Sequence, residues 1–272
     1  MRDFARWMGF TCCSRPALQA GVAVLFRRTH RGQTIEVRSA GQTRRLYVDG
    51  VLHTQHRPGA VLSGGVWDPL ALSGLFAPPD TIRRVLVLGL GGGAVIPILE
   101  RILKPEEIVA IELDPLRPRL ARRFFGLRTS PRRRIIEGDA IAWVRAYRGP
   151  PFQMIIDDIS TEQNGEPVRA VRADATWIQS LSAILDQKGI LTLNAFSRAE
   201  LSQCPLFRAD ARSRRFGAAY RLEDPRFENA IGVASSWAQT PNAFWRRVRS
   251  TTAIRQPLAF RVTRLRSTRG SS

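Results

Sequence analysis

Several short stretches of the sequence carry residues whose types and spacing suit chemistry. In VLVLGLGGGAV an apolar run leads directly into Gly89, Gly91, Gly92 and Gly93. Glycines there let the backbone turn sharply and approach a ligand closely, and the helix that follows would present unpaired N–H groups and a positive dipole end. Together with Ala94 the cluster also satisfies GxGxxG/A, a fingerprint that is weak on its own. It predicts a site for an anionic or nucleotide ligand.

Two carboxylates follow at the ends of the next two apolar runs. Glu112 ends the run in AIELDP, where a carboxylate can accept hydrogen bonds from both ribose hydroxyls. Asp139 and Ala140 end the run in IIEGDA; the Asp139 carboxylate suits an adenine amino group, or the N-cap of the next helix, or both. Three successive strand ends thus carry a glycine cluster, a Glu and an Asp, which favours S-adenosylmethionine over NAD as the cofactor. An NAD-type oxidoreductase is the alternative.

The stretch MIIDDISTE supplies the candidate reaction centre. Asp157, Asp158, Ser160 and Glu162 follow a hydrophobic run, at the edge where ligands of open α/β sheets bind. Because side chains alternate along a strand, Asp157 and Asp158 point in opposite directions and only one can face the cofactor. We expect Asp158 to be the catalytic residue, since the run places it at the strand tip. Alternatively, either carboxylate caps the turn or pairs with an arginine.

A parallel sheet would bring these residues to one edge, and the sequence has its pattern. After Arg83, apolar strands alternate with amphipathic helices, which is typical of a sheet covered on both faces. Before it, β-rich segments and the Asp49-Gly50 turn indicate a small antiparallel lobe. Parallel strands are predicted at 84–89, 107–112, 133–138, 152–157 and 189–195, helices at 115–125, 174–186 and around PNAFWRRVR, and a last strand pair at AAYRLED and NAIGVASSW.

The chain is expected to have one main domain with flanking segments. Its tail from Thr263 is basic, small and polar, which is typical of disorder. The predicted organisation is a disordered arm at 1–20, a β-rich lobe and connection at 21–82, a Rossmann-like domain at 83–250, and a basic segment with a disordered end at 251–272.

The composition limits the class of protein. The formal net charge is +19, and Lys104 and Lys188 are the only lysines among 42 basic residues. GC-rich coding would produce part of this arginine excess, and a basic footprint supports binding of an anionic macromolecule only where it gathers on one face. Three cysteines without CxxC or nearby His indicate neither a zinc site nor a disulfide framework, so we expect a reducing cytoplasm. No run approaches the ~20 apolar residues of a membrane span.

Five motifs follow one another in the order LYVDGVLHTQ, VLVLGLGGGAV, IELDP, EGDA and FQMIIDDIS. Together and in this order they resemble the spermidine synthase (polyamine aminopropyltransferase) family over about residues 46–237. The resemblance implies an α/β fold, a class I S-adenosylmethionine-dependent methyltransferase (Rossmann-like) sheet with a small N-terminal β lobe. It implies a cofactor of the S-adenosylmethionine type. It places Glu112 on the ribose, Asp139 with Ala140 at the adenine, and Asp158 at the reaction centre.

The departures from that family favour one of its branches. The synthases have GGGDGG where this chain has GLGGGA, so Gly92 replaces the acid that meets the aminopropyl amine. Thr161 stands where they have the usual base, and His53 stands where their Gln is expected. A diammonium substrate would lack carboxylate partners in such a site. Methyl transfer from an activated sulfonium, by contrast, mainly requires that the acceptor be positioned next to the methyl group. The chain therefore looks like the spermidine-synthase-like methyltransferases.

We expect an S-adenosylmethionine-binding methyltransferase with an unknown acceptor and no metal. The alternatives are aminopropyl transfer from decarboxylated S-adenosylmethionine, with Glu162 or Glu166 replacing the missing acid, and a basic binding module without turnover. An acidic macromolecule would suit the arginine excess as acceptor, no membrane partner is expected, and a homodimer is left open. The cofactor contacts are assigned to Gly89, Gly91, Gly93, Glu112, Asp139 and Ala140.

Overall fold

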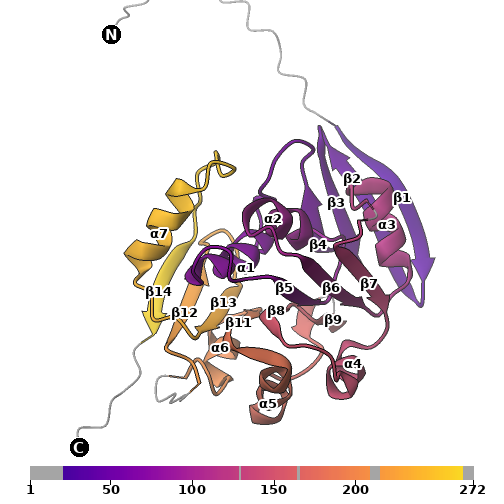
Figure 1. The fold of residues 1–272 in the computed structure, drawn as a ribbon. Helices are drawn as coiled ribbons and strands as arrows, with labels where there is room; N and C mark the ends of the chain where they lie inside the picture. Colours follow the sequence, from indigo (N-terminus) through magenta and orange to yellow (C-terminus); the bar gives the residue numbers. More distant parts are fainter. Residues whose placement is uncertain (1–20, 129, 164–165, 209–214, 266–272) are drawn as a thin grey trace, which may run out of the picture.

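The structure is a computed structural model that describes residues 21–128, 130–163, 166–208 and 215–265. Its centre is a mixed sheet (Figure 1). The order across this sheet is β14 (Arg261–Leu265), β12 (Ala218–Glu223), β13 (Ala230–Ser235), β11 (Leu185–Ala195), β8 (Phe152–Asp157), β5 (Arg84–Leu88), β6 (Glu107–Glu112) and β7 (Arg133–Glu137). The strands from β11 to β7 are parallel, and β13, β12 and β14 continue the sheet antiparallel. The predicted α/β architecture is therefore confirmed.

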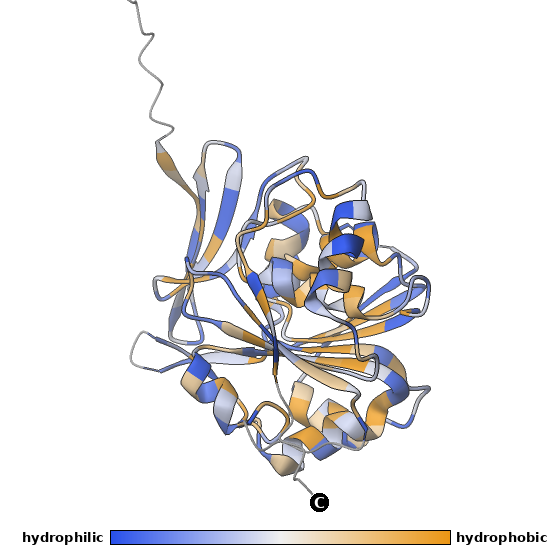
Figure 2. Cartoon of the chain, turned by 90° about the vertical axis from the view of Figure 1, so that its left-hand side faces the viewer, coloured by the Kyte–Doolittle hydropathy of each residue, from blue (hydrophilic) through white to orange (hydrophobic). Residues whose placement is uncertain are grey.

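Helices cover both faces of this sheet, because strand residues point alternately to the two sides. Val85 and Val87 of β5 pack into one apolar layer, whereas Leu86 and Leu88 pack into the other. The strands form the most continuous hydrophobic part of the chain, between helices with polar outer faces (Figure 2). The first layer holds α1 (Trp67–Leu72), the short helix η1 (Ser73–Phe76), α2 (Val95–Ile102) and α7 (Pro241–Ser250), and the second holds α4 (Ala140–Ala146), α5 (Ala175–Ile184) and α6 (Arg198–Gln203).

The N-terminal lobe is a separate antiparallel sheet that packs on one helix of the main domain. Leu46 of the lobe and Leu120 of α3 (Leu116–Phe124) belong to the same buried cluster. The predicted Asp49-Gly50 turn is present, with positive φ at both residues and Val48 paired with Val51. The strands of the lobe are β1 (Val22–His30), β2 (Gln33–Ala40), β3 (Thr43–Val48) and β4 (Val51–His56).

The structure adds elements that the sequence pattern did not predict. A hairpin of β9 (Ser160–Gln163) and β10 (Glu166–Arg169) follows β8. The predicted disorder from Thr263 is wrong for residues up to Leu265, which pair with β12 in β14. β14 is an edge strand whose residues are exposed or half-buried, so RVTRL lacks the apolar pattern that would predict a strand. The predicted arm at 1–20 and the end at 266–272 lie outside the described residues, and the domain boundaries stay predictions.

None of the helices in the described part of the chain combines the length and the apolar character that a membrane crossing requires.

Candidate active site at the carboxyl edge of the sheet

The glycine cluster forms the loop between β5 and α2, and its backbone needs glycine. Gly89, Gly91 and Gly93 have φ values of +84°, +55° and +83°, a region that other residues rarely adopt. A Cβ atom placed on Gly89 would lie 2.5 Å from the carbonyl oxygen of Asp158. The loop therefore passes directly against the end of β8, so that two of the sequence motifs meet.

Glu112, at the end of β6, holds this loop in place. Its Oε2 accepts hydrogen bonds from the N–H groups of Leu90 (3.0 Å) and Gly91 (3.1 Å), and its Oε1 accepts one from Asp114 (2.9 Å). Glu112 is 8% exposed. A carboxylate has about four acceptor positions, so one position at Oε1 is left for a ligand hydroxyl. The position and the spare acceptor of Glu112 fit a ribose contact.

The remaining N–H groups of the loop are also paired. Gly92 donates to the Thr54 Oγ1 atom of β4 at 2.6 Å, and Gly93 donates to the Leu90 carbonyl at 2.8 Å. A Cβ atom on Gly92 would lie 2.6 Å from Thr54 Cγ2. The unpaired N–H groups expected at the start of the following helix are therefore not supplied by residues 90–93, which lie ahead of α2. The N-terminal lobe covers the loop instead, and sequence reasoning missed Thr54.

The Thr54–Gly92 contact leads to a prediction. Thr54→Val keeps the shape of the side chain but leaves the buried N–H of Gly92 without a partner, which should lower the free energy of unfolding by about 1–3 kcal/mol. Thr54→Ser keeps the hydroxyl and is the matched control. Urea denaturation of both variants measures the difference. Equal stability of the Val and Ser variants would contradict the role given to this hydrogen bond.

Asp157 and Asp158 point in opposite directions, as strand alternation predicted. Asp157 is fully buried, and its Oδ2 accepts hydrogen bonds from Arg169 Nη2 (2.6 Å) and from Trp177 Nε1 of α5 (2.7 Å). It thus takes the alternative role of pairing with an arginine. Its negative charge is therefore paired with Arg169 inside the protein.

Asp158 lies at the tip of β8, next to the glycine loop. Its N–H donates to the Leu88 carbonyl at 2.9 Å, and its Oδ1 accepts from Asn194 Nδ2 of β11 at 2.7 Å. Burial raises the pKa of its carboxyl group to about 7; the Asn194 hydrogen bond lowers that pKa and the negative charge of Asp157 raises it. Within the described residues its Oδ2 accepts no hydrogen bond. One carboxylate oxygen thus stays open toward a ligand.

The third strand end carries Asp139 and Ala140. Asp139 caps α4, since its Oδ1 accepts from the Ile141 N–H at 2.8 Å, and it is otherwise exposed. The cap role foreseen as one alternative is therefore present, and it leaves the other carboxylate oxygen accessible. Sequence reasoning missed Leu113, which follows Glu112 and is 63% exposed. An exposed apolar side chain between two strand ends suits the face of a purine.

A buried polar cluster joins the lobe to the hairpin after β8. His53 Nε2 lies 2.6 Å from Glu162 Oε1, and His53 Nδ1 lies 3.0 Å from Arg117 Nη1. Since a guanidinium can only donate, Nδ1 accepts and Nε2 carries the proton. Glu162 Oε2 accepts from Gln33 Nε2 at 2.8 Å. Burial lowers the pKa of His53, whose ring therefore stays neutral at pH 7. Glu162 is thus already bound to protein groups.

Within the described residues, no group of three or more His, Cys, Asp or Glu side chains is placed to hold a metal ion.

The comparisons with known proteins point to two groups of transferases. The chain is 25% identical over 199 residues to a polyamine aminopropyltransferase of Vibrio vulnificus, covering 71% of this chain and 64% of that one. It is 28% identical over 176 residues to an eEF1A lysine and N-terminal methyltransferase homolog of Drosophila pseudoobscura pseudoobscura, covering 62% and 25%. The chain is a relative of both groups. It spans less than two thirds of the first protein and a quarter of the second, and no family model matches it.

Solved structures show the same fold. A probable spermidine synthase from Corynebacterium glutamicum superposes with a TM-score of 0.69 at 14% identity, over 88% of this chain and 90% of that one. Human methyltransferase-like protein 13 in complex with SAH superposes with a TM-score of 0.50 at 20% identity, over 67% and 90%. The predicted class I methyltransferase-like fold with an N-terminal β lobe is confirmed.

Proposed function

We propose that this chain is an S-adenosylmethionine-dependent methyltransferase. The observation that carries the proposal is the meeting of three groups at one edge of the sheet. The glycine loop contacts the end of β8, Glu112 holds that loop and keeps a spare acceptor, and Asp158 keeps an open carboxylate oxygen beside it. The methyltransferase relative and the SAH-bound structure of the human protein support a cofactor of this type.

The described residues fit such a cofactor. Glu112 would accept from a ribose hydroxyl, while Asp139 with Ala140 would meet the adenine and Leu113 its face. Asp158 would place a negative charge near the sulfonium. When bound, the cofactor supplies a methyl group that its positive sulfur already activates. The protein then has to position the acceptor and exclude water.

The pairing of two acidic residues, one at the end of β8 and one in the hairpin after it, favours methyl transfer over aminopropyl transfer. A diammonium acceptor needs several free carboxylates, because a buried ammonium must be paired. Asp157 is bound to Arg169, and Glu162 is bound to His53. Gly92 and Thr161 supply no carboxylate. Aminopropyl transfer from decarboxylated S-adenosylmethionine is the second candidate, since the Vibrio relative carries that name.

For the acceptor we propose an acidic macromolecule, on the ground of the net charge of +19. The test uses labelled S-adenosylmethionine with cell extracts pretreated with nuclease or protease. Label that appears on a macromolecule and disappears after one pretreatment supports the proposal and gives its class. Label confined to small molecules overturns it. The homodimer and the cytoplasmic location stay predictions.

The raised pKa of Asp158 predicts a pH-dependent preference between two ligands. Below pH 7 its carboxyl group is protonated and neutral; above pH 7 its negative charge attracts a positive sulfonium. The affinity ratio of S-adenosylmethionine to SAH, whose sulfur is neutral, should therefore rise roughly tenfold as the pH increases through about 7. The amino acid end is common to both ligands, so its titration cancels in the ratio.

Calorimetry with both ligands from pH 5.5 to pH 8.5 measures this ratio, with Asp158→Asn as the matched variant. The variant should show a flat ratio. A flat ratio in the unmodified protein, or the same rise in Asp158→Asn, would contradict the position assigned to Asp158.

A further inference from the structure

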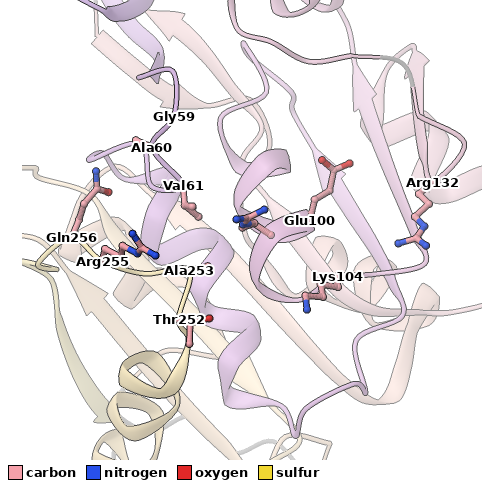
Figure 3. A pocket seen from close by; sticks show the side chains of 11 residues that line it. Gly59, Ala60, Val61, Glu100, Lys104, Arg132, Thr252, Ala253, Arg255 and Gln256 are labelled. Atoms are coloured by element: carbon pink, nitrogen blue, oxygen red, sulfur yellow. The ribbon is translucent and has the colours of Figure 1, made fainter.

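A cavity of about 820 Å³ lies away from the candidate active site (Figure 3). α2 begins at the glycine loop, and the cavity borders the opposite, C-terminal end of this helix. Arg132 precedes β7 and so lies at the amino end of the parallel strands. The other walls of the cavity come from residues 59–61, after β4, and from residues 252, 253, 255 and 256, after α7. Segments distant in the sequence thus meet around one hollow.

Four cationic side chains line this cavity, which we call the basic trough. In Figure 3, Arg132 and Arg255 lie on opposite sides, and Lys104 lies between them. The trough is defined by Arg101, Lys104, Arg132 and Arg255. All four are exposed at the surface, so water or a ligand can reach them.

The positive charge of the trough is not balanced by the protein. Glu100 is its one acidic lining residue, and its Oε1 and Oε2 are taken by Arg133 Nη2 at 2.6 Å and 2.7 Å. None of the four trough cations forms an ion pair or a side-chain hydrogen bond within the described residues. Other arginines of the same domain do, such as Arg84 with Glu107. Four like charges around one hollow favour an anionic occupant.

The remaining lining indicates the class of anion. It is small or polar and contains no aromatic ring: Gly59, Ala60, Val61, Thr252, Ala253 and Gln256. Without aromatic side chains there is no platform on which nucleobases stack. Without a large apolar pocket there is no anchor of the kind that protein partners use. Guanidinium groups, by contrast, match phosphate oxygens well.

We infer that the basic trough binds the sugar-phosphate backbone of a nucleic-acid strand without reading its sequence. Phosphate contacts fix a strand in place and carry no sequence information, which fits a lining of cations and small side chains. The inference does not depend on the transferase proposal, because the trough and the candidate active site share no residue.

The test compares two variants of equal net charge. Both lose four exposed arginine or lysine side chains, so each falls from +19 to +15. Full-length proteins are used, so the charges outside the substituted positions are the same in both. The trough variant is R101A/K104A/R132A/R255A, and the control variant is R28A/R119A/R122A/R145A.

Fluorescence anisotropy with a single-stranded oligonucleotide of 20 mixed bases measures the affinity at several salt concentrations. The trough variant should bind at least tenfold more weakly, and the slope of log affinity against log salt should fall by about 3, since each phosphate contact contributes roughly 0.7. The control variant should lose less than threefold. Equal losses in both variants, or none in the trough variant, would overturn the inference.

Two further arms separate the remaining explanations. If polyglutamate of equal charge competes as strongly as an unlabelled oligonucleotide, the nucleic-acid assignment is overturned in favour of an acidic polypeptide. Thermal unfolding checks the fold of each variant. If the trough variant is destabilised, K104A/R255A replaces it, and its affinity for the oligonucleotide is also expected to fall. Cofactor binding should be unchanged in the trough variant, and a protein that binds no cofactor at all leaves this test intact.

Discussion

Gly89→Ala should lower the free energy of unfolding by about 3 kcal/mol or more and abolish cofactor binding. The residue has a φ of +84°, and an added Cβ would lie 2.5 Å from the Asp158 carbonyl oxygen. That oxygen belongs to backbone that is held to β5 by the hydrogen bond from the Asp158 N–H to the Leu88 carbonyl. The clash cannot be relieved by a side-chain movement, so the loop and the tip of β8 must separate.

Gly138→Ala is the matched control, because Gly138 also follows a parallel strand of the same sheet. No atom lies within 4 Å of a Cβ placed there, and its φ is not in the left-handed region. Its stability should stay within about 0.5 kcal/mol of the unmodified protein. Urea denaturation and calorimetric titration of S-adenosylmethionine measure both variants. If the two substitutions had similar effects, the close approach of the loop to β8 would be contradicted.

Glu112→Ala should weaken S-adenosylmethionine binding by about 100-fold, since hydrogen bonds to a charged group are worth roughly 1.5–3 kcal/mol each. The variant removes the proposed ribose contact and also frees the N–H groups of Leu90 and Gly91, which now donate to the carboxylate. Stability should therefore fall together with affinity. Glu112→Gln keeps one carbonyl acceptor but points an NH₂ group at N–H donors, so an intermediate loss is expected.

Glu106→Gln provides the control for the charge change. Glu106 lies just before β6, at the opposite end of the strand that Glu112 terminates, and its side chain is 61% exposed. Its ion pair with Arg83 is a surface pair, which contributes little. Binding in this variant should match the unmodified protein. Normal affinity of Glu112→Ala would show that this strand end does not hold the cofactor.

The sequence predicted the sheet because its strands are buried on both faces. Such strands read as continuous apolar runs, so their ends, and the residues at those ends, could be placed. Alternation then separated Asp157 from Asp158. The pattern could not show how the loop N–H groups are paired, because their partners Glu112 and Thr54 lie 21 to 38 residues away along the chain, and periodicity carries no information on such pairs.

The buried cluster around His53 shows the same limit. Its partners Glu162 and Arg117 lie 109 and 64 residues away, in segments with no pattern that links them. The basic trough was equally hidden, since the charge excess was evident from the composition but its gathering on one face is a property of the fold. Residue types and local spacing thus predict the edge of the sheet, whereas the contacts between segments require the structure.

The central claim, a site for intact S-adenosylmethionine, is tested most directly by calorimetric titration with that cofactor and with its decarboxylated form. Both forms carry one ammonium group, but the decarboxylated form lacks the carboxylate that balances it, and neither Gly92 nor Glu162, which is bound to His53, can pair with that ammonium. The proposal predicts binding of both with preference for the intact cofactor. Preference for the decarboxylated form would make aminopropyl transfer the better assignment. Binding of neither would contradict the proposed site.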